Sequence, residues 1–401
     1  MKDTELFALA LGIVNPWYVS KVDFDEEKKR LDMYIDFKAG SVFKCTECGT
    51  ESKVYDTAQK TWRHLNFFQY EAYLHARAPR TNCDKDGVKL ANVPWARQQS
   101  GFTLLFEALV LALVKHMPVA TLANHVGEHD TRIWRILEYY VEKEVAATDL
   151  SEVTKVGVDE TAARRGHNYV TIAVDLDEKK AIFVTEGRDS STIEAFSKDL
   201  IAKGGKPENI TDVSIDMSPA FISGVGKHLP KAAITYDKFH IMKHLNDAVA
   251  AVWRQERSTS EFMKSSKMLW LKNRSNLKEH QSMMLDVLLK CNTKTGRAYR
   301  LKIAFQEIFT LPREHAEAAM TKWYKWAIRS RLAPMKEFAR LLKRHWNGIM
   351  NWFKSGINNG ILEGLNSLIQ ATKAKARGYR TFKNFRIMIF LVIGKLNLQP
   401  I

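Results

Sequence analysis

The most constraining feature of the sequence is the order of short apolar runs and helical segments between residues 151 and 245. Three strand-like runs come first, joined by short polar links: "VTKVGVDETA", "NYVTIAVDL" and "AIFVTEG". A helix, a strand, a helix and a further strand follow: "DSSTIEAFSKDLIAKG", "ITDVSIDMS", "PAFISGVGKHL" and "AAITYD". Short links pair strands antiparallel, whereas helical crossovers join parallel strands. The segment therefore predicts a mixed sheet, an antiparallel meander extended by crossover strands.

Two of these strand-like runs end in an acid. Asp159 follows "VGV" and Asp216 follows "VSI". Two carboxylates held at the ends of neighbouring strands repel each other, so the arrangement favours a bound cation. Glu363, on a later helical stretch, offers a third carboxylate. Three oxygen ligands suit Mg²⁺ or Mn²⁺, which could then act in phosphodiester chemistry.

Structural roles for the three acids compete with this interpretation. Acids at strand ends are also common turn residues. An exposed Glu beside Lys and Arg is usually a solvated ion-pair partner of small value. The order of the three acids along strands and helices, in a strongly basic chain, favours the catalytic interpretation.

The charge balance indicates a polyanionic partner. The 401-residue chain has a net charge of +16 and a pI near 9.5, which points to nucleic acid or, less simply, to an anionic membrane surface. Residues 253–354 hold 22 Lys and Arg against 8 Asp and Glu, an excess of 14. No apolar run approaches the roughly 18 residues of a membrane span, and no basic region precedes the first apolar run. We therefore expect no membrane partner and no signal peptide.

Three of the four cysteines lie in the first hundred residues, and their number suits a reducing compartment such as the cytoplasm. Cys45 and Cys48 form a CxxC turn, and Cys83 belongs to a distant second half of a zinc site. Asp86, three residues after Cys83, is a candidate fourth ligand. His64 and His75 are alternatives, and a metal-free knuckle packed by aromatic residues is the competing interpretation. Cys291 has no partner at ligand spacing, so we expect a plain thiol.

Residues 101–150 have the layout of a helix-turn-helix. "PVATLANHVG" predicts a short helix, "EHD" a tight turn and "TRIWRILEYYV" a second helix capped by Asp130 or Thr131. Arg132 and Arg135 could then face DNA. The alternative is an ordinary helical hairpin in a small helical domain.

Only helical patterns occupy residues 246–352, which include six of the ten Trp residues. We expect these Trp side chains to pack in a core or an interface, although stacking on an unpaired base is possible chemistry. The next helical stretch places one acid among amides and becomes basic after two turns. Its polar face comprises Asn359, Glu363, Asn366, Gln370, Lys373 and Arg377.

Several long blocks, in order, resemble the DDE transposases of bacterial insertion sequences, and the ISL-three family in particular. These blocks are "GVDETA…GHNYVTIAVDL", "SIDMSPAF", "TYDKFHIMKHLNDAV" and "NNGILEGLNSLIQATKAKARGYRTFKNF". The resemblance covers nearly the whole chain. The family pattern leads one to expect a second cysteine pair in the zinc site, and here "CDKDG" departs from it.

The resemblance implies an RNase H-like catalytic fold with an all-helical insertion between the second Asp and the Glu. It implies catalytic acids at Asp159, Asp216 and Glu363, with Asp237 and His240 as possible supporting residues. The implied reaction is cleavage of a phosphodiester by water at an element end, followed by direct attack of the freed 3′-hydroxyl on target DNA. Such a route needs no covalent protein–DNA intermediate.

The predicted fold class is multidomain α+β. We expect a zinc-binding N-terminal domain, a helix-turn-helix region, an RNase H-like core in two parts and a basic helical insertion between them. The respective boundaries are 1–100, 101–150, 151–245 with 353–401, and 246–352.

The predicted function is a transposase that binds the terminal inverted repeats of its element and cuts and joins double-stranded DNA, as a dimer on that DNA. Predicted cofactors are catalytic Mg²⁺ or Mn²⁺ and structural Zn²⁺, and the predicted location is the bacterial cytoplasm, in association with the nucleoid. The predicted DNA contacts are Arg132, Arg135, Lys373, Lys375 and Arg377. Two alternatives remain, a non-catalytic DNA-binding regulator and a metal-dependent nuclease that cuts without joining.

Overall fold

The computed structural model describes residues 2–164, 168–259, 261–355, 357 and 360–400. The chain forms two compact units, Met1–Val141 with Asn397–Ile401, and Glu142–Leu396. Within the described residues, every helix is too short or too polar to cross a membrane. Asn359, at the start of the predicted polar face, lies outside the described residues.

The N-terminal unit contains a six-stranded sheet in the order β1-β2-β5-β4-β3, with β6 beside β5. The bounds are β1 Trp17–Asp25, β2 Arg30–Phe37, β3 Val42–Lys44, β4 Glu51–Arg63, β5 Glu71–Cys83 and β6 Gly87–Leu90, after helix α1 Asp3–Ala10. β1 and β2 form an antiparallel hairpin. β4 and β5 are 13 residues each, and their pairing continues past the bulge between Val54 and Asp56.

Three helices follow, α2 Leu104–Leu113, α3 Val119–Val126 and α4 Asp130–Ala146, and the last of them continues past Val141 into the second unit. Thr103 begins α2, because its side chain accepts a hydrogen bond from Phe106 N. Gly127 ends α3 in the left-handed conformation, where a Cβ would lie 2.7 Å from a Glu71 carboxylate oxygen. Asp130 is already the first residue of α4, so the expected cap is part of the helix. The helix-turn-helix layout is confirmed.

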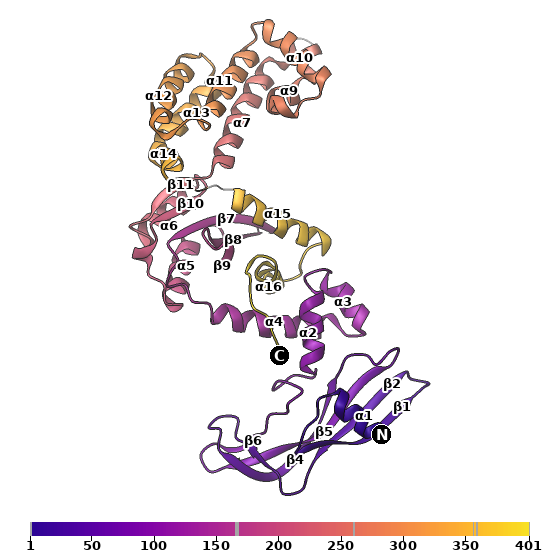
Figure 1. Ribbon diagram of the computed structural model, residues 1–401. Helices are drawn as coiled ribbons and strands as arrows, with labels where there is room; N and C mark the ends of the chain where they lie inside the picture. Colours follow the sequence, from indigo (N-terminus) through magenta and orange to yellow (C-terminus); the bar gives the residue numbers. More distant parts are fainter. Residues whose placement is uncertain (1, 165–167, 260, 356, 358–359, 401) are drawn as a thin grey trace. The chain divides into compact units, whose positions relative to one another are not determined.

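The second unit contains a five-stranded sheet in the order β11-β10-β7-β8-β9 (Figure 1). The bounds are β7 Lys155–Arg164, β8 Asn168–Asp175, β9 Lys180–Glu186, β10 Asp212–Ile215 and β11 Ala233–Tyr236. β7, β8 and β9 pair antiparallel, while β10 pairs parallel with both β7 and β11. The expected mixed sheet, with a meander and crossover strands, is confirmed. The crossover helices are α5 Ser190–Ala202 and α6 Pro219–His228, with a short turn η1 Pro207–Asn209.

A long helical region follows β11. It comprises α7 Lys238–Glu256, η2 Arg257–Thr259, α8 Glu261–Ser265, α9 Lys267–Leu271, η3 Arg274–Asn276, α10 Glu279–Lys290, α11 Lys294–Ile308, α12 Arg313–Arg329, α13 Ala333–Arg344 and α14 Trp346–Ser355. One hydrophobic core runs from the sheet into these helices. Trp253, Trp270 and Trp323 are buried in it, as expected, and each indole N–H donates a hydrogen bond. Trp326 is 47% exposed.

The chain returns to the sheet through α15 Gly360–Lys375 and ends with α16 Phe382–Ile393. Gly157 in β7 allows a close approach of α15. A Cβ at Gly157 would lie 2.9 Å from both terminal methyl carbons of Leu362. Leu362 is buried and precedes Glu363. The missing side chain in β7 therefore helps to set the position of the helix that bears Glu363.

Candidate active site, zinc site and DNA-binding surfaces

The pairing of three parallel strands places three aspartates in one row. Ser214 pairs with Gly157, so Asp216 and Asp159 are each two residues beyond that pair. Ile215 pairs with Tyr236, so Asp216 is also level with Asp237. Neighbouring strands lie about 4.8 Å apart. The sheet register thus brings the predicted Asp159 and Asp216 together and adds Asp237 beside them.

Backbone N–H groups hold these carboxylates in place. Asp216 Oδ1 accepts a hydrogen bond from Ser218 N at 2.9 Å, at the start of α6. Asp237 Oδ1 accepts from Phe239 N at 2.6 Å and caps α7. Asp159 Oδ1 accepts from Glu160 N at 2.7 Å. Asp237 therefore caps a helix and Asp216 lies just before the N-cap of another, where the helix dipole also favours negative charge.

Burial and the neighbouring carboxylates favour the neutral, protonated forms of Asp159 and Glu160 over their charged forms, as the pKa of each group indicates. Burial, with the nearby charges of Asp237 and Asp216, raises the pKa of Asp159 to about 6, against the opposing effects of the Glu160 N–H and His240. Burial and the charge of Asp216 also raise the pKa of Glu160. A divalent cation would relieve this repulsion, and carboxylate oxygens are the ligands that Mg²⁺ and Mn²⁺ prefer.

Two further side chains border the row. His240 Nε2 lies 3.9 Å from Asp237 Oδ2, so the pair Asp237 and His240 is brought to the site as expected. Glu160 is half-buried, and Arg188 Nη1 lies 4.0 Å from its Oε1. Sequence reasoning missed Glu160, although its place directly after Asp159 was the available signal.

Glu363 lies in the first turn of α15 and is exposed. It forms no hydrogen bond or ion pair within the part of the chain that the structure describes. Asn366, one helical turn later, donates a hydrogen bond from Nδ2 to Asp159 Oδ2. The helix therefore contacts the acid row through Asn366 and leaves the Glu363 carboxylate available as a ligand.

The polar face of α15 follows β7 away from the acid row. Gln370 Nε2 donates to Thr161 Oγ1, and Lys373 Nζ donates to the Ala162 carbonyl oxygen at 2.5 Å. Sequence periodicity placed Asn366 and Gln370 on this face without a role. Their role in the structure is to hold α15 along the strand that bears Asp159.

The predicted zinc ligands come together in the N-terminal unit. The ligand atoms of Cys45, Cys48, Cys83 and Asp86 all lie within 4.8 Å of one another. Cys48 Sγ is 3.4 Å from Cys83 Sγ, and Cys45 Sγ is 3.4 Å from Asp86 Oδ2. Among the residues described, this is the one group of three or more such side chains found that close together. Three thiolates and a carboxylate fit a tetrahedral structural zinc.

The alternative histidine ligands are engaged elsewhere. His64 Nδ1 lies 2.9 Å from Thr103 Oγ1, and burial lowers the pKa of His64 to about 4. His75 lies between Thr61 and Asp32, with contacts of 2.9 and 2.5 Å. Both histidines are thus held away from the cysteine cluster. Cys291 is an exposed free thiol, as expected.

The two arginines predicted to face DNA differ in the structure. Arg132 forms an ion pair with Glu128, and its guanidinium lies 4.3 Å from the centre of the Phe102 ring. Arg135, one turn further along α4, is exposed. Arg135 is therefore the freer of the two for a phosphate or base contact, whereas Arg132 also helps to attach the turn before α4.

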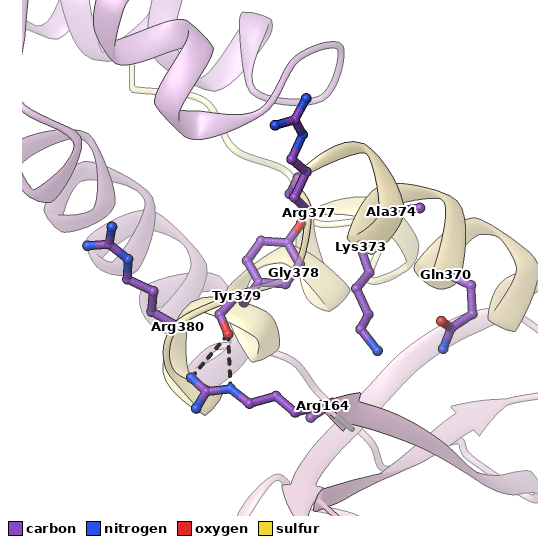
Figure 2. Close-up of a pocket in the computed structure, with 10 residues that line it drawn as sticks. Arg164, Gln370, Lys373, Ala374, Arg377, Gly378, Tyr379 and Arg380 are labelled. Carbon is purple, nitrogen blue, oxygen red and sulfur yellow. Dashed lines mark hydrogen bonds between the residues drawn. The ribbon is translucent and has the colours of Figure 1, made fainter. Parts of the chain in front are cut away.

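The predicted basic residues near the end of α15 also differ. Lys373 is half-buried against β7, whereas Lys375 and Arg377 are exposed. Lys373 and Arg377 line a pocket with Arg164 and Arg380. Figure 2 shows this pocket, in which Arg164 reaches the carbonyl oxygen of Tyr379. The sequence patterns did not indicate Arg164 and Arg380, because these two residues lie in segments without a helical period.

Three family models match successive parts of the chain. A zinc-finger of transposase IS204/IS1001/IS1096/IS1165 matches residues 41–86, and the helix-turn-helix domain of transposase family ISL3 matches residues 91–141. A transposase model of the same family matches residues 156–389.

Two relatives match nearly end to end. The chain is 27% identical over 420 residues to the transposase for insertion sequence element IS1557 of Mycobacterium tuberculosis, which covers 95% of this chain and 93% of the relative. It is 29% identical over 394 residues to the transposase for insertion sequence element IS1001 of Bordetella parapertussis, covering 95% and 96%.

A zinc ribbon, a helix-turn-helix and a mixed catalytic sheet in one basic chain define a DNA-binding transposase. The transposase model alone spans more than half of the residues. The chain belongs to the ISL3 family of transposases, and the regulator and simple nuclease alternatives are not favoured.

Proposed function

We propose that this transposase binds the terminal inverted repeats of its own insertion sequence and catalyses metal-dependent strand cleavage and strand transfer. Asp159, Asp216 and Glu363 are the proposed catalytic acids and ligands of Mg²⁺ or Mn²⁺. Asp237 and His240 are proposed to support them. The observation that carries the proposal is the register of β7, β10 and β11, which makes neighbours of the half-buried Asp159 and Asp216 and the buried Asp237.

Each proposed residue has a separate part in the reaction. Bound divalent ions would activate the attacking oxygen and stabilise the leaving oxygen of the phosphodiester. Asp159 and Asp216 offer oxygens fixed by strand ends and backbone hydrogen bonds. Asn366 orients the second Asp159 oxygen. Glu363 offers the third carboxylate from α15. Because water and then a 3′-hydroxyl are the nucleophiles, the protein needs no nucleophilic side chain.

DNA recognition is assigned to the N-terminal unit. The zinc ribbon with Cys45, Cys48, Cys83 and Asp86 is proposed to hold structural Zn²⁺, and α4 to enter a groove with Arg135 foremost and Arg132 beside it. The helical region has a large excess of basic residues and is proposed to bind phosphates without reading sequence.

The proposed layout assigns residues 1–100 to zinc and DNA binding, 101–150 to the helix-turn-helix, 246–352 to the insertion, and 151–245 with 353–401 to catalysis. Two element ends must be brought together for transposition, so we propose a dimer on DNA. Its place of action would be the bacterial cytoplasm, on the nucleoid.

A cleavage and joining assay tests this function. The substrate is a DNA fragment that carries the ends flanking this gene, beside the same fragment with both ends scrambled, in Mg²⁺ or Mn²⁺. We expect cleavage at the native ends together with joined product. Cleavage without joining would indicate the nuclease alternative, and specific binding without cleavage in either metal would indicate the regulator.

A further inference from the structure

An open pocket of about 970 Å³ lies where the end of β7 meets the end of α15. The pocket belongs to the second unit, and none of the three aspartates of the acid row lines it. Figure 2 shows Lys373 and Gln370 pointing toward the strand, while Arg377 and Arg380 project away from it. Arg164 lies beneath the turn that follows α15.

The lining of this basic pocket carries charge of one sign. Four of its ten described residues are cationic, namely Arg164, Lys373, Arg377 and Arg380, and none of the ten is acidic. The C-terminus of α15 opposes an anion with a partial charge of about −0.5. Four full positive charges outweigh that partial charge several-fold, so the pocket favours an anion.

The positions and contacts of these cations suit the binding of an anion. Arg164 Nε and Nη2 donate to the Tyr379 carbonyl oxygen at 3.3 and 3.2 Å. These bonds fix the planar guanidinium and leave further N–H donors, so less entropy is lost when a phosphate binds. Arg377 and Arg380 are exposed, and neither forms an ion pair with an acid among the residues described. No carboxylate has to be displaced before an anion binds.

The basic pocket continues the surface that begins at the acid row. Asn366, Gln370 and Lys373 contact Asp159, Thr161 and Ala162 in turn. Arg164 is five residues beyond Asp159 on β7, which at about 3.3 Å per residue is roughly 16 Å. Successive phosphates of one strand wind around the duplex and lie roughly 6–7 Å apart, so this separation is about two to three phosphates.

We propose that the basic pocket binds a backbone phosphate of the strand that is cut, about two to three nucleotides from the scissile phosphate. This assignment rests on the proposed function, since it takes the acid row as the place of the scissile phosphate. The contact would fix the register of the strand on the active site without reading sequence.

Phosphate neutralisation tests the assignment. Duplexes of the element end carry one uncharged methylphosphonate at each of positions one to ten from the cleavage point, in either strand. Binding is measured without divalent metal, so a defect in cleavage cannot affect the result. Wild type should bind roughly tenfold more weakly when the neutral group lies about two to three nucleotides from the cleavage point in the cut strand.

The variants show whether the pocket makes that contact. Arg380→Gln should weaken binding to unmodified DNA by a similar factor and should lose its sensitivity to the neutral group at that position. Arg164→Lys keeps the positive charge but loses the paired N–H donors of the planar guanidinium. Its binding should therefore lose part of the same sensitivity to the neutral group. Lys231→Gln removes an exposed charge before β11, at the opposite end of the strands from the acids, and should behave as wild type.

Equal sensitivity of Arg380→Gln, Arg164→Lys and wild type at every position would overturn the assignment. So would a loss confined to the uncut strand. Thermal unfolding of each variant checks that it is folded. If wild type binds its ends but never cuts them, the proposed catalytic function fails, while the same binding data still decide for or against the pocket.

Discussion

At the residue scale, the acid row is a site whose stability and function conflict. Each aspartate is held by backbone N–H donors, yet the row brings buried like charges together. The pKa of about 6 for Asp159 expresses that conflict, with burial as its first cause. Removing the charge should therefore stabilise the metal-free protein while abolishing metal binding.

Asp159→Asn tests this conflict. The folded pKa of about 6 exceeds the ordinary value of 3.8, so the folded state binds more protons between these values. The stability of the metal-free wild type thus falls as pH rises through this range, by up to about 3 kcal/mol. At pH 7.5 the variant should have a Tm several degrees above wild type, and this gap should shrink near pH 4. Equal Tm values at pH 7.5 would contradict the account.

Asp86 makes a second residue-scale prediction. A carboxylate is an unusual ligand in a structural zinc site, and it stands here beside three thiolates. Asp86→Cys should tighten zinc binding, and Asp86→Ala should weaken it by tenfold or more, as measured by competition with a chromogenic chelator. His75→Ala is the control, because His75 contacts Asp32 and Thr61 instead. A zinc affinity that falls in His75→Ala but not in Asp86→Ala would show that Asp86 is not the fourth ligand.

At the element scale, the contact between α15 and β7 positions the third proposed acid. Gly157→Ala adds a methyl group 2.9 Å from Leu362 and Leu176 carbons. We expect a loss of about 1–3 kcal/mol in unfolding free energy from overpacking, and a fall in strand cleavage as α15 shifts. Gly226→Ala in α6 is the matched control, because nothing lies within 4 Å of the added carbon. Comparable cleavage by both variants would show that α15 needs no such close approach.

The elements of the catalytic sheet could be predicted from sequence because apolar runs and links alternate clearly between β7 and β11. The proximity of Asp159 and Asp216 followed from their place at strand ends. The row with Asp237 depends on the parallel register of β10 and β11, which local sequence does not encode. In the basic pocket, Arg164 contacts the carbonyl oxygen of Tyr379, which lies 215 positions away in the chain. No periodicity in the sequence indicates such a contact.

At the scale of the whole molecule, specificity and affinity are assigned to different parts. The zinc ribbon and helix-turn-helix belong to one unit, while the basic helices belong to the other. Removing zinc should therefore reduce the preference for native ends over scrambled ends to the part read by α4, and should leave much of the non-specific binding. That residual binding should fall steeply with salt, with a log–log slope of about −0.9 for each phosphate contacted.

Electrophoretic mobility shifts over a range of salt, with and without a zinc chelator, measure both quantities. Restoring zinc should restore the preference for native ends. A preference that is unchanged by complete removal of zinc would show that the zinc ribbon takes no part in reading sequence. A weak dependence of the residual binding on salt would contradict the assignment of the basic helices to phosphates.

The most direct test of the central claim is strand cleavage by acid variants at native element ends. Asp216→Cys replaces a hard oxygen ligand by a thiolate, which Mg²⁺ tolerates poorly. We predict no cleavage by this variant in Mg²⁺ and partial recovery in Mn²⁺, with Glu363→Gln inactive in both metals. The control Glu194→Gln in α5, where Glu194 is half-buried and pairs with Lys198, should be fully active. Full Mg²⁺-dependent cleavage by Asp216→Cys or by Glu363→Gln would place the reacting phosphate away from the row of β7, β10 and β11.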